Sequence, residues 1–435
     1  MNYKECLEYI DDVTKKYGIS PGLDNMNIML DYYKRPEKKL SIVHLSGTNG
    51  KGSTAAYLAS ILKSAGFTVG RYISPCILDY REKIIIESSV EKRYITEDEV
   101  SKYISEIKED IKYAFCNGGH PTPFEIETVM ALRMFADNKT DYVILECGMG
   151  GELDATNAIC GKEMCIFTSI SLEHTRFLGN TLEEIAHNKA GIINCKCNVV
   201  SVNQRDSVND IISTCANKYN CKYVKCDEPV NIKLSLEKTS FDYCDRKYET
   251  MLHAYYQPYN AVAAIEAAKI LLSDKMNEEE KYDTISKGIM KAYWPGRFEI
   301  VSKNPCVVFD GAHNPAGIEA FVSGVKLLYP ENEYRRIGII GVFADKNIEK
   351  MADYIKNIFD ELYTVTAKKP RGMDADALAE RLEAYLWKKV TPCMDNDIIS
   401  LINDVSGQKM DDRSEAFFVF GSLSLYELVK GGKVE

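Results

Sequence analysis

The sequence predicts an α/β protein of two unequal domains, the second of them smaller and Rossmann-like. Its length of 435 residues exceeds what one hydrophobic core usually holds. Short β-branched runs alternate with segments of helical period, as is typical of parallel strands joined by helices. These runs lie at residues 40–46, 67–72, 141–146, 164–170 and 198–202. A second series, after the Pro-Gly turn at 295–296, predicts strands near 306–310, 336–342, 361–366 and 416–420.

Between the first two strands, apolar residues recur at helical spacing over residues 55–62, and Gly66 is expected to end that helix. Residues 228–250 alternate polar and apolar side chains, which predicts a hairpin attached to the first domain. We place the domain boundary at the Pro-Gly turn, giving domains of residues 1–296 and 297–435.

The charge balance argues against polyanionic partners. The chain has 54 basic and 64 acidic residues, a formal charge of −10, which disfavours nucleic acid and anionic membranes. Its 14 cysteines are scattered without a Cys-x-x-Cys pair, and the N-terminus lacks the basic and apolar regions of a signal peptide. No apolar run approaches the roughly 18 residues of a membrane helix. We therefore expect a cytoplasmic, monomeric protein that binds small molecules.

Residues 41–54, SIVHLSGTNGKGST, read as a strand, a glycine-rich turn and the start of a helix. A Walker A loop would place glycine at Leu45 and a hydroxyl at Gly52. Here the hydroxyl comes one position later, as Ser53, after Lys51. Small residues still let backbone N–H groups converge on phosphate, with the lysine as a point charge and the serine as a Mg²⁺ ligand. A flexible turn is the alternative, but the strand and helix context favours nucleotide binding by Gly47, Thr48, Asn49, Gly50, Lys51, Gly52 and Ser53.

The segment HLSGTNGKGST (44–54) resembles the ATP loop of the Mur ligase superfamily, specifically its folylpolyglutamate synthase and dihydrofolate synthase branch. The resemblance extends over nearly the whole chain. It implies that residues 1–296 form a P-loop ATPase domain, the ATP-binding central domain of Mur-type ligases. It also implies that residues 297–435 form the amino-acid-binding ligase domain.

A carboxylate follows the strand at 141–146, in the block DYVILECGMGGELDATN. A strand-end position opposite a phosphate loop suits a Mg²⁺ ligand, so we assign Glu146 to the metal, with a merely solvated strand-end glutamate as the alternative. The block resembles the family pattern E-x-G-x-G-G-x-L-D-A-T-N. Within it, Asp154 is expected to contact substrate, and Glu152 stands where the family usually has arginine.

The block at 169–193 resembles the family pattern D-H-x-x-x-L-G-x-T-x-x-x-I-A-x-E-K-A-G-I. By this resemblance His174 is a third ligand of the magnesium site, with Ser53 and Glu146. Lys189 matches a lysine that is typically carbamylated and then binds a second Mg²⁺; unmodified, it would contact phosphate. Glu173 and Asn188 depart from the family's aspartate and glutamate.

Two further segments point to the acid substrate. Thr122, Pro123 and Glu125 form a capping-box pattern at the head of a helix. They also match the family's T-x-F-E, so Thr122 and Glu125 are candidate substrate contacts. The segment ISPCILDYREKI (73–84) resembles S-P-H-L-x-x-x-x-E-R-I, which makes Ser74 a candidate, with Cys76 in place of the usual histidine.

The remaining segments that match the family imply contacts with the nucleotide and with the amino-acid substrate. The segment YYQPYNAVAAIEAA (255–268) resembles H-Q-x-x-N-A-x-x-A, with Tyr256 replacing histidine and Asn260 expected near adenine. WPGRFE matches W-x-G-R-x-E, where the guanidinium of Arg297 would clamp phosphates. GAHNPAG (311–317) follows Asp310 and matches D-G-A-H-N-P, which implies contacts of Asp310 and His313 with nucleotide and amino acid; a helix cap and a turn residue are the plain alternative. Ser422, at a helix start, is a candidate carboxylate contact.

Together these matches predict an ATP-dependent amide ligase that adds L-glutamate to the γ-carboxylate of a folate through an acyl phosphate. Lys51, Lys189, Arg297 and His313 are the predicted catalytic residues, ATP and one or two Mg²⁺ the cofactors. Three alternatives remain open. They are dihydrofolate synthase activity, alone or combined with the first; a Mur-type ligase acting on another acid; and a nucleotide-binding homologue without catalysis.

Overall fold

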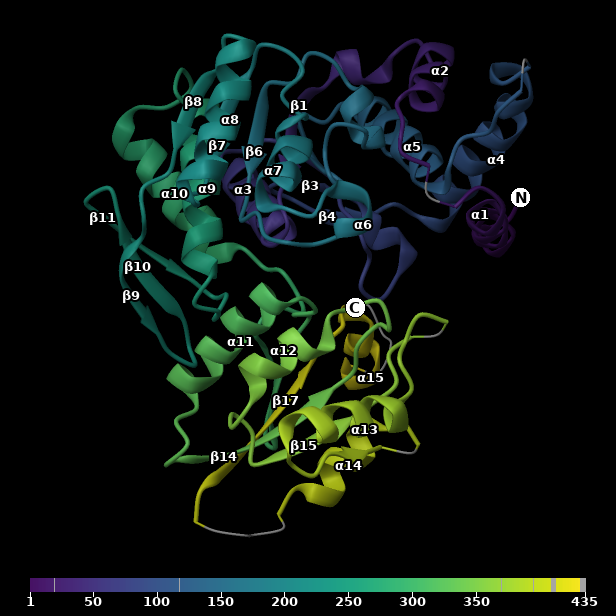
Figure 1. Cartoon of the computed structure of the whole chain (residues 1–435). Coiled ribbons are helices and arrows are strands. Elements are labelled where there is room, and N and C mark those ends of the chain that lie inside the picture. The colour runs from purple at the N-terminus through teal and green to yellow at the C-terminus, as the bar shows by residue number, and fades with distance from the viewer. Residues whose placement is uncertain (19, 117, 369, 394, 408–411, 431–435) are drawn as a thin grey trace. The chain divides into compact units, whose positions relative to one another are not determined.

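The computed structural model describes residues 1–435 except 19, 117, 369, 394, 408–411 and 431–435. The chain divides into two compact units, shown in Figure 1. The first contains Met1–Cys76, Tyr80–Pro229 and Tyr259–Ala292, and the second contains Ile77–Asp79, Val230–Pro258 and Tyr293–Glu435. Each unit is thus assembled from separate segments of the chain. The assignment of two functional domains, 1–296 and 297–435, stays a prediction.

The first unit contains an eight-stranded, mostly parallel sheet in the order β4-β3-β2-β5-β1-β6-β7-β8. Among these described strands, the antiparallel pairs are β2 with β3 and β3 with β4, at one edge of the sheet. The predicted runs at 40–46, 67–72, 141–146, 164–170 and 198–202 are confirmed as β1, β2, β5, β6 and β7. The strands are β1 (Ser41–Ser46), β2 (Val69–Tyr72), β3 (Ile84–Glu87), β4 (Lys92–Tyr94), β5 (Tyr142–Glu146), β6 (Met164–Phe167), β7 (Asn198–Ser201) and β8 (Lys222–Lys225).

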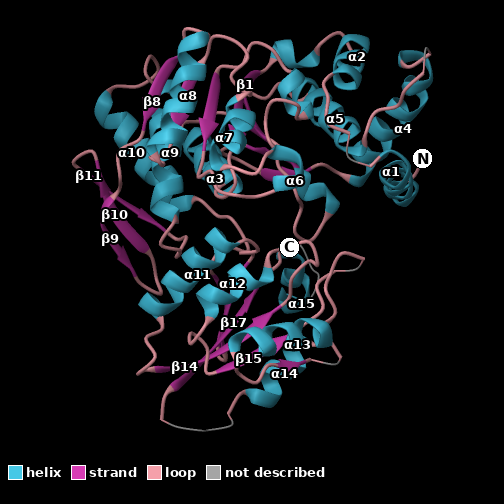
Figure 2. Cartoon of the chain, in the orientation of Figure 1, coloured by secondary structure: helices cyan, strands magenta, loops and turns pink. Residues whose placement is uncertain are grey.

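Helices cover both faces of this sheet (Figure 2). One face carries α1 (Tyr3–Tyr17), α2 (Asp24–Tyr32), α4 (Glu97–Ala114) and α5 (Pro123–Asp137), whose apolar side chains pack with Ile42 and Val143. Ser60 on α3 (Lys51–Ser64) donates a hydrogen bond to Gly288 of α10 (Glu278–Lys291), so these two helices pack together. The other helices are η1 (Pro36–Lys39), η2 (Tyr80–Lys83), η3 (Ala155–Ala158), α6 (Thr175–Leu178), α7 (Leu182–Ala190), α8 (Asp206–Lys218) and α9 (Gln257–Leu271).

Residues 228–250 differ from the predicted hairpin. They form a three-stranded antiparallel sheet of β9 (Val230–Leu234), β10 (Thr239–Tyr243) and β11 (Arg246–Thr250). This sheet lies in the second compact unit, and its predicted attachment to the first functional domain stays a prediction. The alternation of polar and apolar residues indicates a half-buried strand but does not say which core the apolar face meets.

The second unit also contains a six-stranded sheet in the order β12-β13-β17-β14-β15-β16, parallel except for β12. All four strands predicted here are confirmed, as β13, β14, β15 and β17. The strands are β12 (Glu299–Lys303), β13 (Cys306–Asp310), β14 (Tyr334–Ile340), β15 (Glu361–Thr364), β16 (Thr391–Pro392) and β17 (Ser414–Phe420). The helices are α11 (Pro315–Leu328), α12 (Ile348–Ile355), α13 (Ala375–Leu386), α14 (Ile398–Val405), η4 (Leu423–Leu425) and α15 (Tyr426–Lys430).

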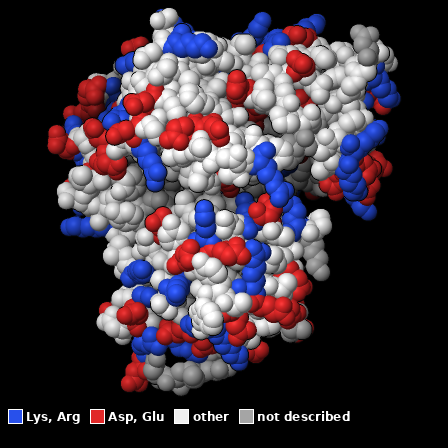
Figure 3. All heavy atoms as spheres, in the orientation of Figure 1, with Lys and Arg blue, Asp and Glu red and all other residues white. Residues whose placement is uncertain are grey.

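Both units therefore have the predicted α/β class, with strand ends and helix starts meeting at one edge of each parallel sheet. Basic and acidic side chains are interspersed on the molecular face shown in Figure 3. Among the described helices, none is long and apolar enough to cross a membrane.

Candidate active site

The glycine-rich turn between β1 and α3 has a backbone that only glycine can adopt at two positions. Gly47 has φ +152°, and a Cβ there would lie 2.0 Å from Thr168 Oγ1. Gly50, the N-cap of α3, has φ +92°, and its Cβ would lie 2.2 Å from Asn260 Oδ1. A side chain at either position would therefore displace a neighbour as well as strain the backbone. The shape of the turn therefore depends on glycine at these two positions, and the nucleotide contacts of residues 47–53 stay a prediction.

The segment after β6 anchors this turn. The backbone N–H groups of Thr48 and Asn49 donate to the Ser169 carbonyl, at 2.7 and 3.2 Å. Thr48 Oγ1 donates to the Ser171 carbonyl and accepts from the Ser171 N–H, both at 3.0 Å. Because the Thr48 and Asn49 amides point at protein, an anion is expected nearer the start of α3, where helical N–H groups face outward. Ser53 lies buried in that first helical turn.

Lys51 at the start of α3 and Glu146 at the end of β5 lie close together, as the strand-end position of Glu146 predicts. Leu45 of β1 pairs with Glu146 of β5, which brings the end of β5 beside the glycine turn that follows β1. Lys51 Nζ lies 3.8 Å from Glu146 Oε1 and donates to the carbonyls of Gly47 (3.0 Å) and Thr48 (3.2 Å). Glu146 is only 6 % exposed. A cation and a carboxylate thus meet at the loop.

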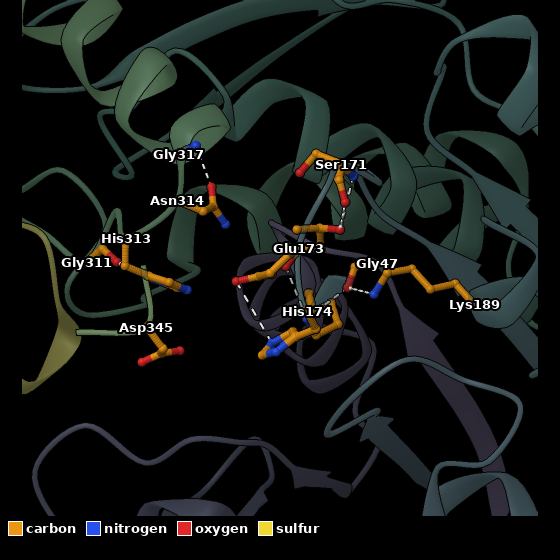
Figure 4. A network of polar contacts seen from close by, with 12 residues as sticks. Gly47, Ser171, Glu173, His174, Lys189, Gly311, His313, Asn314, Gly317 and Asp345 are labelled. Atoms are coloured by element: carbon orange, nitrogen blue, oxygen red, sulfur yellow. Dashed lines mark hydrogen bonds and ion pairs between the residues drawn. The ribbon is translucent and has the colours of Figure 1, made fainter. Parts of the chain in front are cut away.

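Lys189 on α7 reaches the same loop. Its Nζ donates to the Gly47 carbonyl at 2.7 Å, and Figure 4 shows its side chain pointing at Gly47. Burial, with the nearby Lys51 cation, lowers the pKa of Lys189 to about 7. At neutral pH a large share of this amine is therefore uncharged. An uncharged lysine is nucleophilic, which a protonated one is not.

The glycines after β5 let α7 and α5 approach closely. A Cβ on Gly148 would lie 2.7 Å from the Phe124 ring, and one on Gly151 would lie 2.6 Å from the Lys189 carbonyl. Gly150, at φ +75°, would meet the Asn188 side chain at 2.4 Å. This close approach places Lys189 against the loop.

Asp154 fixes the shape of that glycine loop. Its carboxylate accepts hydrogen bonds from the N–H of Met149 (2.8 Å), the N–H of Thr156 (3.0 Å) and the Thr156 hydroxyl. Burial raises its pKa. The structure thus gives Asp154 a positioning role within the loop, and its predicted substrate contact stays a prediction.

His174 and Glu173 lie side by side after β6 (Figure 4). Nε2 of His174 is 4.0 Å from Glu173 Oε1, and the His174 side chain is 41 % exposed. His174 has φ +51° and caps the short helix α6. Among the described residues, no three histidine, cysteine, aspartate or glutamate side chains lie close enough together to hold a metal ion.

The donor chemistry still fits magnesium. Glu146 and Ser53 offer a carboxylate and a hydroxyl oxygen, the hard ligands that Mg²⁺ prefers, and Mg²⁺ usually retains several waters and substrate phosphates. Few protein ligands are therefore needed. The assignment of Ser53, Glu146 and His174 stays a prediction.

The capping box at the start of α5 is confirmed. Glu125 Oε2 accepts from the Thr122 N–H at 2.6 Å, and Thr122 Oγ1 accepts from the Glu125 N–H at 3.3 Å, with Pro123 at the first helical position. Both side chains are buried, and burial raises the pKa of Glu125. These contacts account for both residues structurally, and a contact with substrate stays a prediction.

Ser74 and Cys76 lie in the loop after β2. Burial raises the pKa of the Cys76 thiol, while the nearby Lys83 acts to lower it. Lys83 Nζ is itself 2.6 Å from Glu127 Oε1 on α5. An ion pair therefore joins the segment predicted to face the acid substrate to α5, and its Lys83 acts on Cys76, which stands in place of the usual histidine.

In the second unit, Asp310 organises the loops that carry Arg297 and His313. Asp310 ends β13 and is 2 % exposed. Its carboxylate accepts from the N–H groups of Phe298 and Ala312, each at 2.8 Å. Burial raises its pKa, and the Arg297 cation counteracts part of that rise. The predicted nucleotide contact of Asp310 stays a prediction, but its positioning role is structural.

Arg297 and His313 both lie against the Gly311 peptide. Arg297 Nη1 donates to the Gly296 carbonyl at 2.9 Å and would lie 2.6 Å from a Cβ on Gly311. Nδ1–H of His313 donates to the Gly311 carbonyl at 2.9 Å. In a neutral imidazole this leaves Nε2 as the proton-accepting nitrogen. Arg297, the predicted phosphate clamp, and His313, the predicted base, therefore both lie against the backbone of Gly311. Figure 4 shows the loop that carries His313.

Ser422 and Asn260 have structural partners. Ser422 is 3 % exposed, and its Oγ accepts from the Ser424 N–H at 3.2 Å, capping η4. The Asn260 carbonyl accepts from the Thr54 hydroxyl at 3.3 Å, and its side chain lies over Gly50. Their contacts with amino acid and adenine stay predictions.

Comparison with known proteins relates this geometry to a family. The Mur ligase middle domain matches residues 45–268, and the Mur ligase glutamate ligase domain matches residues 296–416. The dihydrofolate synthase/folylpolyglutamate synthase of Bacillus subtilis (strain 168) is 32 % identical over 421 residues, covering 94 % of each chain. The chain belongs to this Mur ligase family, in its folylpolyglutamate synthase/dihydrofolate synthase branch.

Solved structures agree on the fold. The structure of Mycobacterium tuberculosis folylpolyglutamate synthase complexed with ADP and AMPPCP has a TM-score of 0.86 at 23 % identity, covering 99 % of this chain and 98 % of that one. The structure of E. coli FolC in complex with DHPP and ADP has a TM-score of 0.80 at 28 % identity, covering 99 % and 96 %.

Two departures from the pattern of the family lie in contact. The Glu152 N–H donates to the Asn188 carbonyl at 2.9 Å. Glu152 stands where the family pattern usually has arginine, and Asn188 stands where it has glutamate. This bond joins two backbone groups, so it is independent of both side chains.

His44 is a buried polar residue that the sequence patterns did not single out. His44, in the middle of β1, has no exposed surface. Its Nε2 lies 2.7 Å from Thr156 Oγ1 and 3.1 Å from Cys147 Sγ, which links the core to the Asp154 loop. Burial lowers the pKa of His44 far below its usual range. A polar residue among the apolar residues of a strand could have predicted this contact, because a buried polar group needs a hydrogen-bond partner.

Proposed function

We propose that this protein adds L-glutamate to the γ-carboxylate of a folate, using ATP, and that it also joins L-glutamate to dihydropteroate. The chain is an ATP-dependent ligase of the folylpolyglutamate/dihydrofolate synthase type. One observation carries the assignment of its reaction centre: Lys51 and Lys189 converge on the Gly47 carbonyl, with Glu146 3.8 Å from Lys51. This is where a nucleotide phosphate would need positive charge and a metal ligand.

The proposed reaction has two steps. A carboxylate oxygen of the acid attacks the γ-phosphorus of ATP, the bond to the β,γ-bridging oxygen breaks, and ADP leaves. The amine nitrogen of glutamate then attacks the acyl carbon of the resulting acyl phosphate, inorganic phosphate leaves, and an amide forms. The ammonium group must lose a proton before or during this second attack.

Charge neutralisation in the first step falls to Lys51 and Arg297. Lys51 is held by two carbonyls of the glycine turn, so its ammonium group is already oriented. Arg297 presents a guanidinium, which binds phosphate oxygens through paired hydrogen bonds. Oriented charges of this kind stabilise a transferring phosphoryl group without reorganisation.

Ser53, Glu146 and His174 would hold a Mg²⁺, which when bound would neutralise phosphate charge and orient the phosphate chain. After carbamylation, Lys189 would provide an anionic ligand for a second Mg²⁺. In that modification the neutral amine nitrogen bonds to the carbon of CO₂ and releases one proton to solvent. The lowered pKa of Lys189, about 7, supports the modification because the reactive form is then abundant.

For the second step we propose His313 as the base. Its Nδ1–H is committed to the Gly311 carbonyl, so the neutral imidazole can accept a proton at Nε2. Asp310 holds the loop in place through the Ala312 N–H. Ser422 is a proposed contact for the carboxylate of the amino acid, and Ser74, Thr122, Glu125 and Asp154 are proposed on the side of the acid substrate.

The second activity is favoured by a specific relative. The Bacillus subtilis protein carries both activities in its name, and the matched segments cover 94 % of both chains. Both reactions join L-glutamate to a pteridine carboxylic acid, so one set of ATP-binding residues serves both. The proposed partners are small molecules: ATP, L-glutamate and a folate or pteroate.

An ADP-release assay tests the proposal. Dihydropteroate, tetrahydrofolate and its glutamyl derivatives are each supplied with L-glutamate, with unrelated carboxylic acids as controls. We expect release with both pteridine classes. We expect Lys51→Ala to lower turnover at least about a hundredfold, because one oriented charge is worth several kcal/mol in such a transition state. Near-normal release by this variant, or release only with unrelated acids, would contradict the proposal; no release with any acid would favour a non-catalytic homologue.

A further inference from the structure

The carboxylate of Asp310 has three hydrogen-bond donors. Oδ2 accepts from the Phe298 N–H at 2.8 Å and from the Tyr256 hydroxyl at 2.8 Å. Oδ1 accepts from the Ala312 N–H at 2.8 Å. The two backbone donors belong to the loops that carry Arg297 and His313. The orientation of this one carboxylate therefore sets the position of two proposed catalytic side chains.

The Arg297 loop needs such an anchor because its backbone is strained. Phe298 has φ +47°, a region that non-glycine residues seldom adopt, whereas Gly296 adopts φ +70° without strain. The Phe298 N–H donates to Asp310, and the Gly296 carbonyl accepts from the Gly311 N–H at 2.9 Å. Loss or rotation of the Asp310 carboxylate would release this strain and move Arg297.

Of the three donors, only the Tyr256 hydroxyl belongs to a side chain. It can therefore be replaced by substitution, whereas the two backbone N–H groups cannot. Tyr256 stands where the family pattern has histidine. A phenol donates a hydrogen bond throughout the neutral pH range, whereas an imidazole changes charge near pH 6.5. In this chain the donor to Asp310 therefore keeps its protonation state over the pH range in which a histidine would titrate.

We infer that Tyr256 is a positioning residue for the ligase reaction: its hydroxyl holds the Asp310 carboxylate in the orientation that fixes the Arg297 and His313 loops. The inference rests on the proposed function for its catalytic consequence. The hydrogen bond itself and its effect on Asp310 stand without it.

Removal of the hydroxyl tests this role. We expect Tyr256→Phe to lower kcat about tenfold, the usual effect of losing a hydrogen bond to a charged group, with the KM for the acid substrate little changed. Tyr256→His should recover part of the loss because imidazole can donate. Tyr113→Phe, at an exposed tyrosine on α4, is the matched control and should behave as wild type. Unchanged kcat in Tyr256→Phe, or no recovery in Tyr256→His, would contradict the inference.

A measurement without substrate separates positioning from packing. The charged and titratable groups that act on Asp310 are Arg297 and Tyr256, with His313 on the adjoining loop. Burial raises the pKa of Asp310 above its unfolded value, so the stability linked to this group falls as pH rises through the folded pKa. Without the Tyr256 hydroxyl the folded pKa rises further. The difference in Tm between Tyr256→Phe and wild type should therefore be small in acid and grow toward neutral pH.

A Tm difference that does not vary with pH would indicate lost packing alone and would overturn the inference. The two proposals can thus fail separately. If wild type releases no ADP with any acid, the proposed function fails, while a pH-dependent Tm difference still supports the Tyr256–Asp310 bond. If wild type is an active ligase but neither kcat nor the pH dependence of Tm changes in Tyr256→Phe, only the positioning role fails.

Discussion

Lys189 combines burial with a neighbouring cation, and both disfavour its ammonium form. Its residue type alone predicts a charged side chain that binds phosphate. The structure instead places its Nζ 2.7 Å from a carbonyl oxygen and lowers its pKa to about 7. The chemistry of this residue is therefore decided by its surroundings, and it changes over the physiological pH range.

The pH dependence of the bicarbonate effect tests the proposed carbamate. With a pKa of about 7, the amine is about nine-tenths protonated at pH 6 and about nine-tenths neutral at pH 8. We expect added bicarbonate to raise ADP release clearly at pH 8 and little at pH 6, in buffers first depleted of CO₂. Lys189→Arg, which keeps a cation but cannot form a carbamate, should be inactive at both. Bicarbonate-independent activity at every pH, with an active arginine variant, would contradict the modification.

The sequence could assign residue types to the candidate site but not their environments. Lys51, Glu146 and Lys189 were recognisable because a strand-end position and a matching block place them at one sheet edge. His44 and the three-donor arrangement around Asp310 were not, because each depends on contacts between residues far apart in the chain. Glu125 shows the reverse case, since its capping box was readable from local spacing alone.

At the scale of elements, the first turn of α9 packs against the end of the glycine turn that precedes α3. Asn260, in the first turn of α9, lies over Gly50, and its carbonyl accepts from Thr54 of α3. The glycine turn is thus supported by a helix more than 200 residues away in sequence. This contact explains why glycine is needed at the N-cap of α3 beyond its backbone angle.

Gly50 and Gly66 form a matched pair for testing this support. Both have φ +92°, but a Cβ on Gly66 would have no neighbour within 4 Å, whereas one on Gly50 would lie 2.2 Å from Asn260 Oδ1. Gly66→Ala should lower the free energy of unfolding by about 1 to 2 kcal/mol, from backbone strain alone. Gly50→Ala should cost at least about 1 kcal/mol more and weaken ADP binding at least tenfold. Urea unfolding and calorimetry measure both quantities; equal losses in the two variants would show that Asn260 simply moves away.

The buried parallel strands were predictable, whereas the edges were not. β5 and β13 are mainly apolar runs that each end in an acidic residue, which sequence reveals because both faces of a parallel sheet are covered. The strands β4 and β8 are short and partly exposed, so their residues carry no comparable pattern. The sheet of β9, β10 and β11 was recognised as β structure, but its third strand and its unit depend on long-range contacts.

At the scale of the whole molecule, the two units have separate hydrophobic cores. Phe135 is fully buried in the first unit among side chains of α5, α4 and the sheet. Phe418 is fully buried in the second, on β17. Chains of this length with distinct cores often unfold in more than one step. The chain offers a direct way to observe this, because both tryptophans, Trp294 and Trp387, belong to the second unit.

Tryptophan fluorescence should therefore report the second unit, while far-UV circular dichroism reports both. Trp294 is 8 % exposed and will change environment on unfolding, whereas Trp387 is already 89 % exposed. We expect Phe418→Leu to lower the guanidinium concentration at the midpoint of the fluorescence transition, which corresponds to a loss of about 1 to 3 kcal/mol in free energy of unfolding. We expect Phe135→Leu to lower the midpoint of only that part of the circular-dichroism transition that fluorescence does not follow. Coincident midpoints for both probes in wild type and both variants would mean that the 435 residues unfold as one cooperative body. In that case a substitution such as Gly50→Ala would have to be judged against the stability of the whole chain, because no part of it would open alone.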